Sequence, residues 1–168
     1  MPSRSANFAR GIVKEVFAAW LVSSALSPTG FAAGPGLSAP IRQFIDGINS
    51  GDTKSANAAY ATGDILIVDE VAPHRFSGPN APQDWLDDFG RFAAAAGITD
   101  THLKDSAPTR AEIEGEVAYV VVPTLYTYKE KGKAMKEEGQ LTLVLHSEAG
   151  VWKISAWTWT GVKPHPAK

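Results

Sequence analysis

The sequence contains no cysteine, which excludes disulfide bonds, thiolate catalysis and cysteine-ligated zinc. It also lacks an excess of basic residues: 16 Lys and Arg stand against 18 Asp and Glu, a formal net charge of −2. Because nucleic-acid-binding domains usually present a strongly basic surface, nucleic acid is not an expected partner. The histidines show no metal-ligand spacing, and no glycine-rich phosphate loop or nucleophile elbow is present. We therefore expect neither a metal nor a cofactor.

Long apolar runs are scarce too, and the run near the N-terminus is too short to span a bilayer. Arg4, Arg10 and Lys14 precede VFAAWLVSSAL, and the small residues and helix breakers of SPTGFAAGPG follow. This order is typical of a signal peptide, here residues 1–33, although Glu15 at the edge of the apolar run fits that pattern less well. The alternatives are an amphipathic N-terminal helix or a wrongly chosen start codon. We expect a periplasmic or secreted protein without membrane contact after cleavage, with the cytoplasm as the alternative location.

The composition that remains is that of one globular domain. At 168 residues and 44% hydrophobic content, the chain can bury a sizeable core. Residues 34–40, GPGLSAP, read as a linker because they are rich in glycine and proline. The domain itself is predicted over residues 41–161, and residues 162–168 form a C-terminal tail.

Three helices are predicted before residue 97. Ser38 can cap the first helix and Gly51 can end it, while Asp52 can cap a short second helix. The third is predicted over residues 82–96. The apolar residues at helical spacing are Ile41, Phe44, Ile45 and Ile48 in the first helix, and Trp85, Phe89, Phe92 and Ala96 in the third. Between the second and third helices, ILIVDE reads as a strand that ends in two carboxylates, Asp69 and Glu70.

Strands dominate after residue 115. The segments EVAYVVVPTLYTY, GQLTLVLHS and VWKISAWTWTG predict two consecutive antiparallel hairpins. In the first hairpin, pairing Lys129 with Ala134 places Tyr126 opposite Glu137. In the second, the turn SEAG would pair His146 with Val151.

This register sorts the strand residues onto two faces. The inner face would hold Ala118, Val120, Val122, Leu141, Leu143, Leu145, Trp152 and Ile154, and would turn polar through Thr124, Tyr126, Tyr128, Glu137 and Thr158. The outer face is also apolar, which is typical of a protein interface, and predicts a homodimer contact through Tyr119, Leu125, Trp157 and Trp159. A bulge near Ser155 would exchange the two faces locally.

The order of these elements resembles the nuclear transport factor two-like superfamily, which includes SnoaL-like polyketide cyclases and ketosteroid isomerase. The resemblance rests on IRQFIDGINSGD, IVDEVAPHRFSG and GVWKISAWTWTG, and covers residues 38–161. It implies an α+β fold in which three N-terminal helices pack on a strongly curved antiparallel sheet around a conical pocket (a cystatin-like α+β cone), usually in a dimer.

The resemblance also implies roles for particular residues. Asp69, followed by a glycine nine positions later at Gly78, matches the general base of the isomerases. The isomerases stabilise the enolate with a tyrosine and a protonated acid, a standard example of pKa tuning. The corresponding positions here are Phe44 for the tyrosine and Leu143 or Thr142 for the acid. The usual oxyanion donors are therefore absent, so steroid isomerisation by the known route is not expected.

Each candidate site residue has a structural alternative. Asp69 is a candidate base, or a turn residue that binds nearby backbone amides. His74 is a candidate acid or base, or an exposed loop histidine. Alternation along the strand points Glu70 outward to solvent. The predicted ligand-binding residues are Phe44, Trp85, Thr124, Tyr126, Tyr128, Glu137 and Thr158, of which Trp85 could instead only pack the third helix and Glu137 could belong to a solvated strand edge.

Two functions remain open. The first is a small-molecule-binding SnoaL-like domain that holds a hydrophobic molecule in its pocket. The alternative is an isomerase, cyclase or dehydratase that transfers a proton on a small apolar carbonyl compound with Asp69 as base. The missing oxyanion donors favour binding, whereas the spacing around Asp69 favours chemistry.

Overall fold

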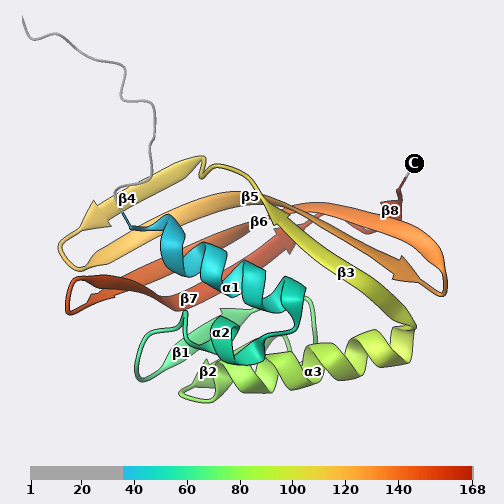
Figure 1. Cartoon of the computed structure of the whole chain (residues 1–168), viewed down its shortest axis with the longest axis horizontal. Helices are drawn as coiled ribbons and strands as arrows, with labels where there is room; N and C mark the ends of the chain where they lie inside the picture. The colour runs from blue at the N-terminus through green and yellow to red at the C-terminus, as the bar shows by residue number, and fades with distance from the viewer. Residues whose placement is uncertain (1–35, 168) are drawn as a thin grey trace, which may run out of the picture.

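The computed structural model describes residues 36–167, so the predicted signal peptide lies outside the described residues. Helices pack against a strongly curved sheet, with α1 crossing its concave side and α3 lying along its β1–β2 end (Figure 1). The helices are α1 (Ser38–Ser50), α2 (Thr53–Asn57) and α3 (Ala81–Ala96). The strands are β1 (Ile65–Val68), β2 (Arg75–Gly78), β3 (Ile98–Asp105), β4 (Arg110–Glu114), β5 (Val117–Glu130), β6 (Lys133–Glu148), β7 (Val151–Gly161) and β8 (His165–Pro166).

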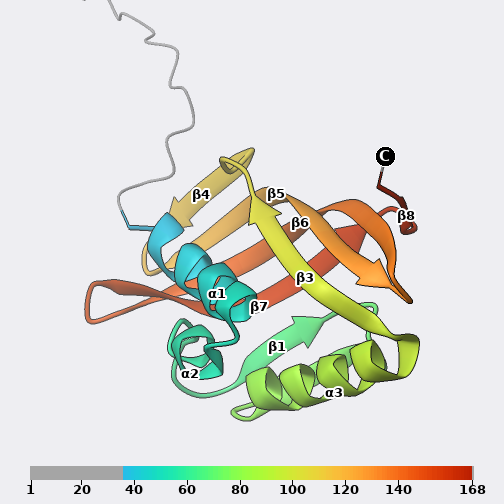
Figure 2. The same cartoon turned by 45° about the vertical axis from the view of Figure 1, so that its right-hand side comes forward.

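The sheet has eight strands in the order β2-β1-β7-β6-β5-β3, with β4 also paired to β5 and β8 to β6. The long strands β5, β6 and β7 form its antiparallel centre. Strand β1 runs parallel to β7, with Leu66 opposite Ala156, so the sheet is mixed and not wholly antiparallel. The second view shows β3 crossing in front of the sheet and continuing from the end of α3 (Figure 2).

The helix boundaries follow local chemistry with one exception. The carboxylate of Asp52 accepts a hydrogen bond from the backbone N–H of Ser55 at 3.0 Å, which confirms it as the cap of α2. Gly51 ends α1 in the left-handed conformation at φ 73°, as predicted. The prediction that Ser38 caps α1 is wrong: the cap position is Leu37, whose side chain is fully buried and anchors the start of the helix by packing.

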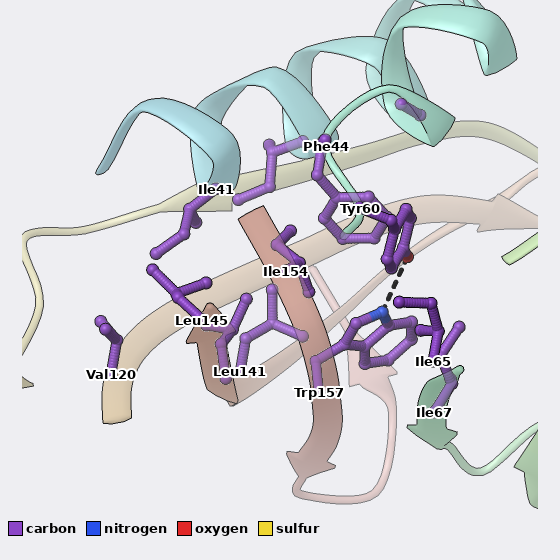
Figure 3. Packing of buried hydrophobic residues seen from close by; sticks show 14 of the residues in the cluster. Ile41, Phe44, Tyr60, Ile65, Ile67, Val120, Leu141, Leu145, Ile154 and Trp157 are labelled. Atoms are coloured by element: carbon purple, nitrogen blue, oxygen red, sulfur yellow. Dashed lines mark hydrogen bonds between the residues drawn. The ribbon is translucent and has the colours of Figure 1, made fainter. Parts of the chain in front are cut away.

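The core lies between the helices and the concave face of the sheet (Figure 3). Ile41 and Phe44 of α1 meet Leu145 and Ile154 of the sheet there. Asn49 ties the end of α1 to β3 through two hydrogen bonds with the backbone of Leu103, both at 2.8 Å. These contacts hold α1 across the sheet and fix the wall of the cavity described below.

Both predicted hairpins form, but only the first has the predicted register. Lys129 pairs with Ala134 and Tyr126 with Glu137, as expected. In the second hairpin Glu148 pairs with Val151 around a two-residue turn, so His146 meets Lys153 and not Val151. The turn residues Ala149 and Gly150 have φ values of 51° and 81°, the conformation that matches the twist of a tight hairpin.

A bulge in β7 then reverses the faces of its last residues. The register shifts between Val144 and Leu145, and the hydroxyl of Ser155 donates to the carbonyl of Val144 at 3.1 Å. Because one extra residue is inserted there, Trp157 and Trp159 point to the inner side. Their assignment to the outer face is therefore wrong, whereas Tyr119, 37% exposed, and Leu125 remain on the outer side.

Some elements were not predicted. Strands β2, β3 and β4 form where a loop or no regular structure was expected, and β8 forms inside the predicted tail. Strand β8 is a two-residue pairing of Met135 with Pro166 and Lys136 with His165. Within residues 36–167, no helix combines the length and the apolar character that crossing a bilayer requires.

Candidate functional site

A cavity opens between α1, α3 and the inner face of the sheet. The space available to the centre of a water molecule is about 120 Å³. This is room for roughly eight water-sized groups, the size of a single-ring organic molecule. The lining residues are Phe44, Ile48, Asp69, Glu70, Val71, Trp85, Phe89, Phe92, Ile98, Leu103, Tyr126, Tyr128, Glu137, Leu141, Trp157, Trp159 and Pro164.

Asp69 follows directly after β1 and presents its carboxylate to this cavity. The indole N–H of Trp85 donates to Oδ2 at 2.5 Å, and the backbone N–H of Glu70 donates to Oδ1 at 2.6 Å. Burial raises the pKa of Asp69, and these hydrogen bonds only partly oppose that shift. The backbone N–H of Asp69 in turn donates to the carbonyl of His74 at 3.2 Å, which closes the loop and fixes the direction of the side chain.

Glu70 lies at the mouth of the cavity, with one side of its side chain exposed to solvent. Desolvation on its inner side, together with the charges of Glu137 and Asp69, raises the pKa of Glu70 to about 7. Glu70 is exposed to solvent as predicted, yet it also lines the cavity, because β1 ends at Val68 and the alternation of the strand no longer holds beyond it. A carboxyl group that titrates near neutral pH therefore stands beside the candidate base.

Glu137 is the most deeply buried acid of the cavity, at 1% exposure. The indole N–H of Trp159 donates to its Oε1 at 3.1 Å. Burial and the nearby charge of Asp69 raise the pKa of Glu137. The expectation of a solvated edge does not hold for this residue, since β6 continues past it and Trp159 covers it from β7.

Eight of the seventeen residues that line the cavity are aromatic. Trp85 and Phe89 of α3 stack with centroids 5.7 Å apart, and Tyr126 and Tyr128 of β5 lie 4.9 Å apart. The hydroxyl of Tyr126 is buried and finds no hydrogen-bond partner among the described residues, 36–167. Desolvation and the neighbouring charges raise the pKa of Tyr126, so the hydroxyl keeps its proton and is a free donor inside the cavity.

A second buried pair supports the floor of the cavity. The indole N–H of Trp157 donates to the hydroxyl of Tyr60 at 2.8 Å (Figure 3). Tyr60 reaches this position because its segment joins the edge of β7, where the N–H of Ala61 binds the carbonyl of Ile154 at 2.8 Å. Trp157 also packs against Trp85, edge to face, at a centroid distance of 5.0 Å. The two tryptophans thereby hold each other in fixed orientations.

The structure brings six of the nine predicted site residues to one cavity: Phe44, Asp69, Trp85, Tyr126, Tyr128 and Glu137. His74 does not line it, because its exposed ring lies behind Asp69, with Nδ1 3.3 Å from the backbone oxygen of that residue. Thr124 is buried on the inner face, yet it is absent from the lining, and its hydroxyl has no partner in the described part of the chain. Thr158 is turned away by the bulge at Ser155 and stands opposite Thr142.

Sequence reasoning missed Glu70, Trp157 and Trp159. The signal for the two tryptophans was the turn Ala149-Gly150 and the possible bulge, which together decide the register of β7. For Glu70 there was no such signal, since the end of β1 depends on where the chain leaves the sheet. Three carboxyl groups thus share the cavity, and within residues 36–167 no group of three acidic or histidine side chains has the geometry of a metal site.

The fold has close counterparts among solved structures. A putative scytalone dehydratase from Novosphingobium aromaticivorans superposes with a TM-score of 0.64 at 12% identity, covering 79% of this chain and 86% of its own. A ketosteroid isomerase-like protein from Erwinia carotovora atroseptica gives 0.59 at 16% identity, with 77% and 95% covered. The chain has the nuclear transport factor two-like fold.

A third solved structure with this fold is named for a different reaction. The hexachlorocyclohexane dehydrochlorinase type 3 from Novosphingobium barchaimii superposes with a TM-score of 0.62 at 15% identity, covering 77% of this chain and 88% of its own. No family model and no curated protein matches the sequence. At such low identity the likeness concerns the fold, and function has to be argued from the cavity.

Proposed function

We propose that the protein binds a small, largely apolar molecule in the cavity between α1, α3 and the sheet. The observation that carries this proposal is an aromatic wall that surrounds a few inward-facing polar groups. Such a combination is typical of ligand sites, in which apolar contact supplies affinity and the polar groups set orientation. The volume of about 120 Å³ suits a ligand of the size of one ring.

The polar groups explain how a ligand would be oriented. The carboxyl groups of Asp69 and Glu137 accept hydrogen bonds, and the free hydroxyl of Tyr126 donates one. A ligand with a hydroxyl or carbonyl group on an apolar ring would give the buried hydroxyl of Tyr126 a hydrogen-bond partner, which it does not find within residues 36–167. The periplasmic or secreted location, as predicted from the N-terminus, would give such a protein access to molecules outside the cytoplasm.

NMR of the tryptophan indole N–H signals tests the binding proposal. Addition of phenol, cyclohexanone or benzyl alcohol is expected to shift the signals of Trp85, Trp157 and Trp159, which line the cavity. The signal of Trp152, which lies at the other end of β7 and does not line the cavity, is the internal control. The proposal would be overturned if, up to millimolar ligand, the signals of Trp85, Trp157 and Trp159 shifted no more than that of Trp152.

A second function, proton transfer on a bound carbonyl compound, is favoured by the position of Asp69. Its carboxylate faces the cavity, and its raised pKa makes it a stronger base than an exposed aspartate. The proton would pass from the carbon next to the carbonyl to Asp69, and the hydroxyl of Tyr126 would donate to the oxygen that becomes negative. This donor stands in for the family's tyrosine and acid, whose positions here are Phe44 and Leu143 or Thr142.

Loss of deuterium from the α-carbons of deuterated cyclohexanone in water, followed by NMR, tests this second function. The protein is expected to accelerate the exchange, and Asp69→Asn is expected to remove the acceleration while keeping an acceptor for Trp85. Asp64→Asn, a matched change at an exposed residue just before β1, is expected to have no effect. Equal rates for the protein and for Asp69→Asn would exclude Asp69 as the base without affecting the binding proposal.

A further inference from the structure

The charged residues that line the cavity are all acidic. Asp69, Glu70 and Glu137 reach it from two separate segments of the chain. Among the described residues that line it, there is no lysine, arginine or histidine. A neutral ligand would leave the three acids facing one another without a counter-charge. We propose that the ligand is an organic cation, a protonated amine or ammonium group carried on an apolar body of about one ring.

The hydrogen bonding of Glu137 supports a cationic partner independently of the acid cluster. Glu137 is 1% exposed, yet within residues 36–167 its side chain accepts a single hydrogen bond, from Trp159 to Oε1. A carboxylate can accept about four hydrogen bonds, so most of its capacity is unused. The carboxyl group also lines the cavity, where an N–H donor on a ligand would reach it. Charge-assisted hydrogen bonds of this kind are about twice as strong as neutral ones.

The aromatic wall supplies the second element of cation recognition. Trp85, Tyr126 and Trp159 line the cavity together with the acids. Rings of this kind attract a positive charge placed over their faces, and sets of such rings recognise quaternary ammonium groups. The same rings give the apolar body of the ligand its contact surface. A carboxylate ligand, in contrast, would meet both the negative faces of the rings and the acids.

The three acids also influence one another. The charges of Asp69 and Glu137 both raise the pKa of Glu70, and the charge of Asp69 raises that of Glu137. A bound cation would remove this mutual repulsion and stabilise the ionised forms. The inference rests on the proposed binding function and adds the charge of the ligand to it.

Benzylamine, benzyl alcohol and benzoate form a matched set of probes, since they share one ring and differ in charge. Titration calorimetry at neutral pH and constant ionic strength is expected to give benzylamine at least about tenfold tighter binding than benzyl alcohol, the effect of one charge-assisted hydrogen bond. Benzoate is expected to bind most weakly. Benzyl alcohol binding as tightly as benzylamine would overturn the charge preference and leave small-molecule binding intact, whereas no binding by any probe would overturn both.

Variants separate the cavity from general attraction between opposite charges. Glu137→Gln keeps the acceptor for Trp159 and is expected to lower the preference for benzylamine over benzyl alcohol about tenfold. Glu138→Gln makes the same change one residue along β6, where the side chain is exposed and pairs with Lys136, and is expected to leave the preference unchanged. If Glu137→Gln does not fold, Glu70→Gln at the exposed mouth replaces it, with the same direction expected. An equal loss in the Glu138 variant would overturn the assignment to the cavity.

Discussion

Because Gly161 has no side chain, the carboxyl group of Glu137 can occupy the space next to it. A Cβ atom at position 161 would collide with this carboxyl group and would lie 3.0 Å from Nε1 of Trp159. Glu137 lies on β6 and Gly161 on the neighbouring strand β7, where Gly161 pairs with Gly139 of β6. The buried acid of the cavity therefore depends on a glycine in β7 that the cavity itself does not contain.

Gly161→Ala is expected to destabilise the protein by about 1–3 kcal/mol, since an added methyl group in a filled space forces its neighbours to move. Chemical denaturation measures this. Gly90→Ala is the matched control, because a Cβ there meets nothing within 4 Å on the exposed side of α3. It is expected to stabilise the protein by about 0.4–1 kcal/mol through the lower entropy of the unfolded chain. Equal effects of the two changes would contradict the close packing at Gly161.

The stability of the protein is expected to fall as pH rises from 4.5 to about 7, because of the acids of the cavity. These two limits are the pKa values of Glu70 in the unfolded and in the folded protein. Folding favours the protonated form of a group whose pKa is raised, so its contribution is complete below the unfolded pKa and is lost as pH rises through the folded one. The expected loss is about 1 kcal/mol, less than the full linkage value because Glu70 is partly exposed.

Denaturation at pH 4.5 and pH 7.5 measures this change, and Glu70→Gln is expected to flatten it. Glu138 acts in the opposite direction, since its ion pairs lower its pKa to about 2. Its contribution is lost only as pH falls below 4.5, outside the window for Glu70. A stability that rises between pH 4.5 and 7.5 would argue against the buried acids.

Tyr60→Phe is expected to cost about 1–3 kcal/mol, because it leaves the buried N–H of Trp157 without an acceptor. Chemical denaturation of Tyr60→Phe, Trp157→Phe and the double variant would measure the coupling between them. The double variant is expected to be more stable than the sum of the single changes predicts, since it removes both partners. Strict additivity would mean that the bond makes no net contribution.

The homodimer stays a prediction, now without Trp157 and Trp159, which lie on the inner face. Tyr119, Val144, Ala156 and Leu66 stand in one cross-strand row on the outer face. Tyr119→Lys is expected to shift the protein from dimer to monomer in size-exclusion chromatography, since a charge would replace an apolar contact. Val162→Lys, at an exposed apolar residue after β7, is the control. Trp157 does not belong to this surface, because it is buried in the cavity lining.

The sequence allowed the order of the helices and central strands and the register of the first hairpin to be predicted. The face of Tyr126 and Glu137 followed from alternation alone, because β5 and β6 pair without interruption. Asp69 was found through its place at the end of an apolar strand. These features depend on local pattern, which a single sequence carries.

The remaining features depend on contacts between distant segments. The bulge at Ser155 is stabilised by a bond to Val144 and by the burial of Trp157 against α1 and α3, neither of which is a local signal. Edge strands such as β2 and β4 form because a neighbouring strand offers them a partner, not because of their own composition. Glu70 joins the cavity for the same reason, since the mouth exists only once the loop after β1 has folded.

The single inserted residue in β7 has a consequence for how such a cavity can diversify. On one side of Ser155 the strand alternates in one phase, and on the other side in the opposite phase. A chain one residue shorter at this point would turn Thr158 toward the ligand and expel both Trp157 and Trp159 to the convex side. Length variation at one position, without any substitution among the lining residues, would therefore exchange an aromatic chamber for a hydroxyl-bearing one.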